Sequence, residues 1–178
     1  MIETNRLLIR AFHEEDASAL YEYLSDPAVY HFEPGEPVTR EQACRMAAER
    51  SRCSIFWAVV LKSAEKLVGH LYFQQVDPKE FRTWELGYIF NPAYQRQGLA
   101  TEASRALIEY GFACWGIHRV VAHCNPGNTA SWRVLEKIGM TREGHMRKNV
   151  TFRNDESGAP VWCDSYEYAI LEDDLRVG

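Results

Sequence analysis

Residues 84–114 read WELGYIFNPAYQRQGLATEASRALIEYGFAC, and this stretch predicts a strand, a tight loop and a helix in succession. The segment from Trp84 to Phe90 alternates large apolar side chains with smaller or polar ones, as a half-buried strand does. Pro92 then ends the strand, because proline has no N–H to donate to a neighbouring strand. Beyond the loop, apolar residues recur at helical spacing from Ala103 to Tyr110.

The loop itself, Gln95-Arg96-Gln97-Gly98-Leu99-Ala100, is followed by Thr101 at an N-cap or first-turn position. A loop with glycine and arginine just before a helix offers free backbone N–H groups, a positive dipole end and a cation to one anion. The alternative is an ordinary turn that uses Gly98 for its backbone freedom. The three-glycine dinucleotide pattern and the Gly-Lys-Ser/Thr of a Walker loop are both absent. The loop is therefore a candidate phosphate cradle of another kind.

The composition indicates one globular domain over residues 1–178. The 20 basic and 25 acidic residues give a net charge of −5, which argues against nucleic-acid binding. The five cysteines are scattered without a Cys-x-x-Cys pair, so neither a disulfide framework nor a zinc site is expected, and a reducing cytoplasm fits best. Residues 55–61 form the longest apolar run, far too short to cross a membrane.

The remaining pattern predicts strands at residues 7–12, 56–61, 66–75, 119–124, 145–152 and 162–171. Helices are expected at about residues 14–24, 39–50 and 129–138. The expected fold is α/β (α+β): a mixed, mostly antiparallel twisted sheet of about seven strands with about four flanking helices. Two irregular loops, residues 30–37 and 153–160, remain as candidates for contacting a substrate.

Three stretches then occur in order: Gln95-x-x-Gly98-x-Ala100 after a strand, Asn128-x-x-Ser131 opening a helix, and Glu136-Lys137-Ile138-Gly139-Met140 closing it. Together they resemble the GNAT superfamily of acyl-CoA-dependent N-acetyltransferases. The opening Thr4-Asn5-Arg6-Leu7-Leu8-Ile9-Arg10 and the closing Trp162-x-Asp164 resemble its RimJ/RimL-like branch, which acetylates protein N-termini, including ribosomal ones, and small amines. The resemblance covers about residues 3–171.

The resemblance implies acetyl-CoA as cosubstrate, with no metal. The loop before the helix would wrap the coenzyme pyrophosphate, and the preceding strand end would bind the pantetheine arm, with an N–H near Phe90 as oxyanion donor. Arg133 and Lys137 could reach the 3′-phosphate in this comparison, but a solvated helix face is the favoured explanation of both. The cosubstrate-binding residues implied are Ile89, Phe90, Asn91, Gln95, Arg96, Gln97, Gly98, Leu99, Ala100, Thr101 and Asn128.

Transfer of an acetyl group to an ammonium first requires removal of a proton. Glu85 is the predicted base, because it resembles a glutamate that family members carry on this strand. The alternatives are a water chain, with Glu85 as a salt-bridged surface carboxylate, or one of three lesser candidates, His70, His123 and Tyr88.

Many superfamily members have a tyrosine that acts as a general acid at the position of Leu135. Leucine cannot donate a proton, so a general acid at this position is excluded here. Ser131 lies four residues earlier, on the same helix face, and is the predicted group that holds or protonates the sulfur. The alternative is a first-turn serine that satisfies local backbone groups.

The sequence thus predicts an enzyme that transfers acetyl from acetyl-CoA to a primary amine by direct attack in a ternary complex. The acceptor is either a protein N-terminal α-amine or a small-molecule amine, and the two irregular loops would form its groove. The alternative function is a non-catalytic acyl-CoA-binding sensor or partner domain. By analogy alone the resemblance also allows a homodimer, and it implies neither a nucleic-acid nor a membrane partner.

Overall fold

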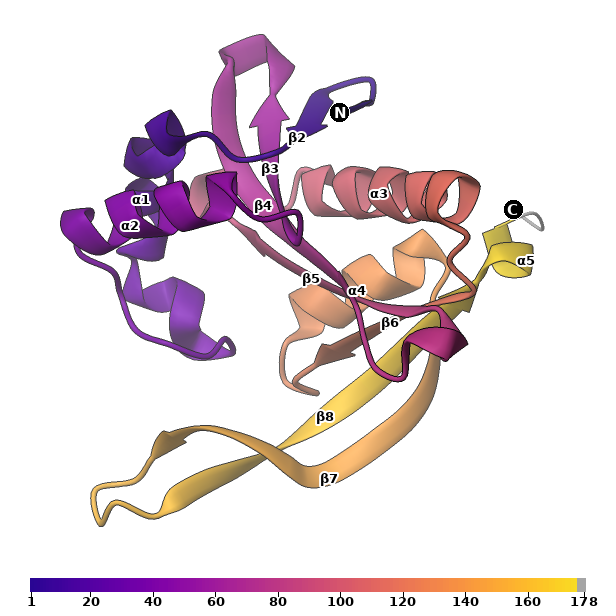
Figure 1. Ribbon diagram of the computed structural model, residues 1–178. Helices are drawn as coiled ribbons and strands as arrows, with labels where there is room; N and C mark the ends of the chain where they lie inside the picture. Colours follow the sequence, from indigo (N-terminus) through magenta and orange to yellow (C-terminus); the bar gives the residue numbers. More distant parts are fainter. Residues whose placement is uncertain (176–178) are drawn as a thin grey trace.

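The computed structural model describes residues 1–175 and contains one eight-stranded sheet in the order β1-β2-β3-β4-β5-β6-β8-β7 (Figure 1). All neighbouring strands are antiparallel except β5 and β6. The strands are β1 (Ile2–Glu3), β2 (Leu7–Arg10), β3 (Phe56–Leu61), β4 (Lys66–Gln75), β5 (Thr83–Phe90), β6 (Arg119–Cys124), β7 (Thr141–Asn154) and β8 (Pro160–Leu171). The predicted mixed, mostly antiparallel sheet is confirmed, and the short β1 is the strand beyond the expected seven.

Helices cover both faces of the sheet (Figure 1). Helices α1 and α2 pack on one face around Leu20 and Tyr23, and α3 and α4 pack on the other around Leu107 and Leu135. The helices are α1 (Ala17–Leu24), α2 (Arg40–Ser51), α3 (Leu99–Trp115), α4 (Thr129–Ile138) and the short α5 (Glu172–Leu175), which the sequence analysis did not expect. None of those in residues 1–175 is both long and apolar enough to cross a bilayer.

The last hairpin departs from the predicted boundaries. Strand β7 begins at Thr141, four residues earlier than expected, because Gly139 ends α4 in a left-handed conformation (φ 105°) and sends the chain directly into the sheet. Strands β7 and β8 stay paired as far as Asn154 and Pro160. The hairpin therefore projects from the rest of the molecule as a long two-stranded ribbon (Figure 1).

The parallel pair β5–β6 is interrupted at the middle of the sheet. The two strands pair only from Thr83 to Glu85, opposite residues 119–121, although β5 continues to Phe90 and β6 to Cys124. Beyond this point the facing edges of β5 and β6 have no strand partner among residues 1–175. A sheet opened in this way leaves main-chain N–H and C=O groups that need hydrogen bonds from water, side chains or a ligand.

Gly69 allows β5 to lie close to β4 at the end of this opening. A Cβ at Gly69 would come within 2.7 Å of the Ile89 carbonyl oxygen and 2.8 Å of the Phe90 ring. Any side chain at residue 69 would displace the strand end, since such contacts are shorter than van der Waals separation. This glycine therefore fixes the position of Ile89 and Phe90.

The N-terminal segment is bonded to the start of α3. The carboxylate of Glu102 accepts from the Thr4 hydroxyl at 2.6 Å, the Arg6 backbone N–H at 3.0 Å and the Arg6 Nε at 2.7 Å. Arg6 also donates to the Gln97 carbonyl at 2.9 Å. Although burial opposes it, the hydrogen bonds from Thr4 and Arg6 lower the pKa of Glu102. The Glu102 carboxylate thus positions Arg6, which in turn supports the loop before α3 through the Gln97 carbonyl.

We expect Glu102→Gln to lower the free energy of unfolding by about 1–2 kcal/mol at pH 7, since hydrogen bonds to a charged group are lost from a partly exposed site. The pKa of Glu102 in the folded protein is lower than its ordinary value of 4.5. The stabilisation is therefore fully present above pH 4.5 and is lost as the pH falls through the folded-state pKa. Urea unfolding at pH 7 and at about pH 3 measures the difference. The exposed Glu41, changed to Gln, is the matched control. An undiminished difference at about pH 3 would contradict the role of the carboxylate charge.

Candidate functional site

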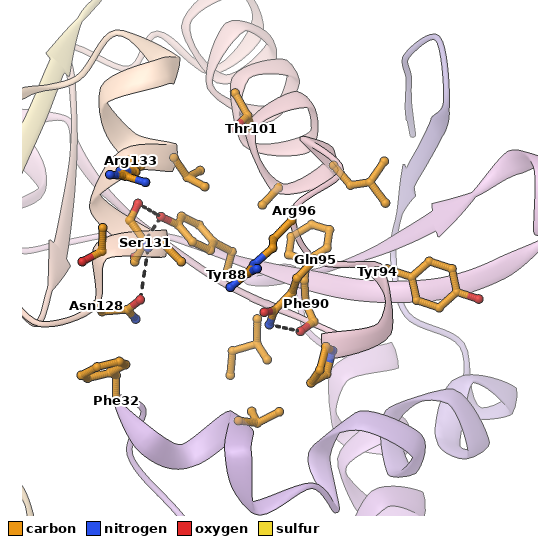
Figure 2. A pocket seen from close by; sticks show the side chains of 18 of the residues that line it. Phe32, Tyr88, Phe90, Tyr94, Gln95, Arg96, Thr101, Asn128, Ser131 and Arg133 are labelled. Carbon is orange, nitrogen blue, oxygen red and sulfur yellow. Dashed lines mark hydrogen bonds between the residues drawn. The ribbon is translucent and has the colours of Figure 1, made fainter.

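A pocket of about 1070 Å³ lies at the opening between β5 and β6. Its wall is formed by the loop after α1, the end of β5, the loop before α3 and the first turns of α4 (Figure 2). The volume is at the upper limit of the ~300–1,000 Å³ typical of ligand pockets. It is sufficient for an elongated ligand together with a second, smaller one.

The loop before α3 turns sharply and leaves backbone N–H groups without a partner among residues 1–175. Gly98 (φ 76°) and Arg96 (φ 60°) both adopt left-handed conformations, so the chain turns sharply into the helix. Within residues 1–175, the backbone N–H groups from Arg96 to Thr101 donate to no protein acceptor. Unpaired N–H groups at a helix start can donate to an anion, so this geometry is compatible with the predicted phosphate cradle.

Three cationic side chains also line the pocket. Arg96, Arg133 and Lys137 all line it, and Figure 2 shows Arg96 pointing into the pocket beside Gln95. Gln95 donates from Nε2 to the Phe90 carbonyl at 3.1 Å, which ties the loop to the strand. The pocket wall therefore combines free N–H groups, a helix dipole and positive charge.

Two of the predicted loop and strand residues lie outside the pocket wall. Gln97 is absent from the lining, and its carbonyl accepts from Arg6. The buried Asn91 caps the turn that follows β5, accepting from Ala93 N–H at 3.0 Å and donating to Glu22 at 2.9 Å. Both act as supports of the loop in this structure. Nine of the predicted residues line the pocket: Ile89, Phe90, Gln95, Arg96, Gly98, Leu99, Ala100, Thr101 and Asn128.

The end of β5 presents its main chain to the pocket. The Asn91 N–H donates to the Val68 carbonyl at 2.9 Å across the β4–β5 ladder. Because N–H directions alternate along an antiparallel strand, the Phe90 N–H points the opposite way, toward the edge from which β6 has diverged. This N–H is positioned to bind a ligand oxygen in the opening.

A hydroxyl pair crosses from β5 to α4 at the centre of the pocket (Figure 2). The Tyr88 hydroxyl donates to the Ser131 carbonyl at 2.9 Å and lies 3.0 Å from the Ser131 Oγ. Asn128 caps the same helix through its Oδ1, which accepts from the Ser131 N–H at 3.2 Å. Burial raises the pKa of Tyr88, so its phenol is protonated at neutral pH. The site thus contains a phenol next to Ser131 even though Leu135 is a buried core residue.

The sequence predicts Tyr88 only as a lesser candidate for the base, whereas the structure places its phenol beside Ser131. The signal for its position was present in the strand alternation, which places Tyr88 on the same face as Leu86 and Phe90, toward α4. What the sequence could not give is the pairing of Tyr88 with Ser131, because that contact joins residues 43 positions apart.

Glu85 is the predicted residue that the structure places elsewhere. It stands at the last paired position of β5 and β6, and it does not line the pocket. Its Oε1 lies 2.9 Å from the Nδ1 of His123, whose Nε2 lies 3.5 Å from Glu167. Although burial opposes it, the hydrogen bond to Glu85 raises the pKa of His123. The pair is half-exposed on the sheet face opposite α3 and α4.

His70 has a structural environment. It is buried beneath α1, and the Tyr23 hydroxyl lies 2.7 Å from its Nδ1. Burial, aided by the charge of Arg50, holds the pKa of His70 well below its usual range. His70 is therefore a neutral core histidine.

The two irregular loops have different positions. Residues 153–160 form the tip of the β7–β8 hairpin and contribute nothing to the pocket, because the flanking strands carry the turn away. The other loop contributes His31, Phe32 and Glu33 to the pocket wall. Within residues 1–175 there is no group of three or more His, Cys, Asp or Glu residues that could hold a metal ion.

Comparison with known proteins agrees with this geometry. A family model described as acetyltransferase (GNAT) domain matches residues 6–141. The uncharacterized N-acetyltransferase YnaD of Bacillus subtilis is 40% identical over 97% of this chain and 98% of its own length. The ribosomal protein uS5-alanine N-acetyltransferase of Escherichia coli is 30% identical over 82% of this chain and 80% of its own.

A solved structure extends the agreement to three dimensions. The crystal structure of a GNAT-family acetyltransferase from Bacillus anthracis superposes with a TM-score of 0.88 at 39% identity, covering 97% of this chain and 98% of that one. The domain match, the relatives and the fold all point the same way. The chain belongs to the GNAT family of N-acetyltransferases.

Proposed function

We propose that this acetyltransferase moves the acetyl group of acetyl-CoA to the primary amine of an acceptor by direct attack, with both substrates bound together. The observation that carries this proposal is the convergence of three features on one pocket. These are the unpaired N–H groups from Arg96 to Thr101, the free strand edge at Phe90, and the Tyr88–Ser131 hydroxyl pair.

The cationic side chains of the pocket wall suit the coenzyme pyrophosphate. Free N–H groups of the loop before α3 donate to it, and Arg96 supplies a charge-assisted contact. Arg133 and Lys137 lie on α4 and are the cations available to the 3′-phosphate. The amide-bearing pantetheine arm then follows the unpaired edge of β5, where it replaces the missing strand partner, and meets Asn128.

The reacting groups follow from these positions. Acetyl-CoA supplies a thioester whose carbonyl oxygen becomes negative on attack, and the Phe90 N–H donates to that oxygen. The acceptor ammonium must first lose a proton, and we propose that a water chain carries it to Glu85, which is paired with His123 outside the pocket wall. The C–N bond then forms and the C–S bond breaks, while the Ser131–Tyr88 pair donates a proton to the leaving sulfur and regains one from the new amide nitrogen. Holding both substrates side by side contributes up to ~7–11 kcal/mol in well-oriented systems.

The acceptor we propose is a primary amine on a protein N-terminus or a small molecule. The Escherichia coli relative that acetylates the alanine of ribosomal protein uS5 supports the first of these. A non-catalytic acyl-CoA-binding role is the competing function, and the missing tyrosine at Leu135 is the observation in its favour. The Tyr88 phenol beside Ser131 argues against it, because Tyr88 on β5 supplies a proton donor in place of the missing tyrosine.

The test of this function is release of free thiol from acetyl-CoA by the purified protein with an amine panel. The panel contains alanine-, serine- and methionine-initiated peptides, spermidine and simple alkylamines. We expect amine-dependent thiol release and an N-acetylated product by mass spectrometry. Binding of acetyl-CoA without product on any amine would instead support the non-catalytic role.

We expect Tyr88→Phe and Ser131→Ala to lower kcat at least 10-fold, since general-acid groups contribute about 10²–10⁴-fold. The KM for acetyl-CoA should stay within about twofold, because the N–H groups that hold it remain. Tyr94→Phe is the matched control: it also removes a phenol from the pocket wall, but one that lies apart from Ser131 (Figure 2). Wild-type turnover by both Tyr88→Phe and Ser131→Ala would remove the pair from the mechanism.

A further inference from the structure

Glu33 is a carboxylate in the pocket wall that the sequence analysis did not single out. It follows the short 3-10 helix Pro27–His31 and is half-buried in the wall. Among residues 1–175 it makes no hydrogen bond and no ion pair, although the pocket also contains Arg96, Arg133 and Lys137. Arg96 lies on the loop before α3, and Arg133 and Lys137 lie on α4.

Packing of its neighbours, and not contacts of its own, holds Glu33 in place. The Tyr30 hydroxyl donates to the Leu24 carbonyl at 2.9 Å, which anchors the segment to the end of α1. The Phe32 ring lies 3.3 Å from where a Cβ at Gly127 would stand, so it packs on the turn that leads into α4. The His31 ring meets the Phe32 ring edge-on at 4.4 Å between centroids. The carboxylate is thus presented by a braced segment.

The charge of Glu33 acts on the centre of the pocket. Burial raises the pKa of the Tyr88 phenol, and the charge of Glu33 adds to that rise. Burial likewise raises the pKa of the Cys124 thiol to about 11, again with a contribution from Glu33. Glu33 and Tyr88 both line the pocket, and Tyr88 and Cys124 lie on the two strands that diverge.

A desolvated carboxylate without a partner is unfavourable in a folded protein. Burial raises the pKa of Glu33, and within residues 1–175 no cation or N–H offsets this. The natural partner of such a group is a cation brought by a ligand. The pocket wall therefore carries a carboxylate that is unpaired within the described residues, as well as three cationic side chains.

We propose that Glu33 is the acceptor-binding carboxylate: it forms an ion pair with the ammonium of the incoming amine and selects acceptors that are cationic. The inference rests on the proposed acetyl transfer and specifies its second substrate. The acceptor enters past the braced segment. Amines that are neutral at pH 7.5, such as arylamines, lack the charge that Glu33 binds.

Steady-state kinetics of Glu33→Gln tests this assignment, with Glu36→Gln as the matched control. Glu36 is an exposed carboxylate on the same segment, outside the pocket, and its change removes the same charge. For the best cationic acceptor of the panel, we expect Glu33→Gln to raise KM at least 10-fold, with the KM for acetyl-CoA within about twofold. Glu36→Gln should resemble the wild type. An unchanged acceptor KM in Glu33→Gln would overturn the proposal.

A second measurement needs no turnover. Carboxyl ¹³C NMR of the CoA-bound protein identifies the Glu33 signal by its loss in Glu33→Gln. We expect this signal to shift on addition of spermidine or an alanine-initiated tetrapeptide amide, and to stay in place with the N-acetylated tetrapeptide. A signal unmoved by every cation, in protein that acetyl-CoA stabilises, would overturn the assignment of Glu33 alone. Failure of acetyl-CoA to bind at all would instead overturn the proposed function.

Discussion

The divergence of β5 from β6 is the constraint on which the rest of this structure depends. Main-chain groups of a buried strand must be hydrogen-bonded, and here the pairing stops at Glu85 while both strands continue. The edge of β5 toward Phe90 is left available to a ligand. Around that edge the chain arranges the loop before α3, the first turn of α4 and the segment that carries Glu33. Each of these would be an ordinary surface feature if the two strands ran together to their ends.

Contacts between distant parts of the chain hold this opening in shape. Arg6, between β1 and β2, donates to Glu102 on α3 and to the Gln97 carbonyl, and so supports the loop before α3. The absence of a side chain at Gly69 lets β4 carry the strand end at Phe90. These contacts shape a pocket whose wall carries three cationic side chains and the carboxylate of Glu33, which suits the polyanionic donor and the cationic acceptor that we propose.

Local patterns in the sequence predicted the parts of the site that short segments encode. The sequence Gln95 to Thr101 specifies a turn and a helix start within seven residues, and Asn128 caps α4 as its spacing from Ser131 suggests. Strand alternation gave the sheet nearly complete; the two-residue β1 was missed because so short a segment has no periodicity. The predicted loop at residues 153–160 was correct as a turn but wrong as a pocket wall, since hairpin length sets its position.

The rest of the site depends on tertiary structure that sequence patterns do not encode. Tyr88 meets Ser131 only because β5 passes beneath α4, and the pairing of Glu85 with His123 follows from strand register. Glu33 is recognisable only in three dimensions, where the lack of a partner becomes visible.

The most direct test of the central claim is thermal unfolding of the purified protein with acetyl-CoA, coenzyme A and NAD, each at about 1 mM. A ligand at ~100 times its dissociation constant stabilises the folded state by about 2.7 kcal/mol, which is a readily measured rise in Tm. The account predicts a rise with both CoA species and none with NAD, since the free strand edge suits a pantetheine arm and NAD has none. No rise with either CoA species would contradict the assignment of the β5–β6 opening as the acyl-CoA site.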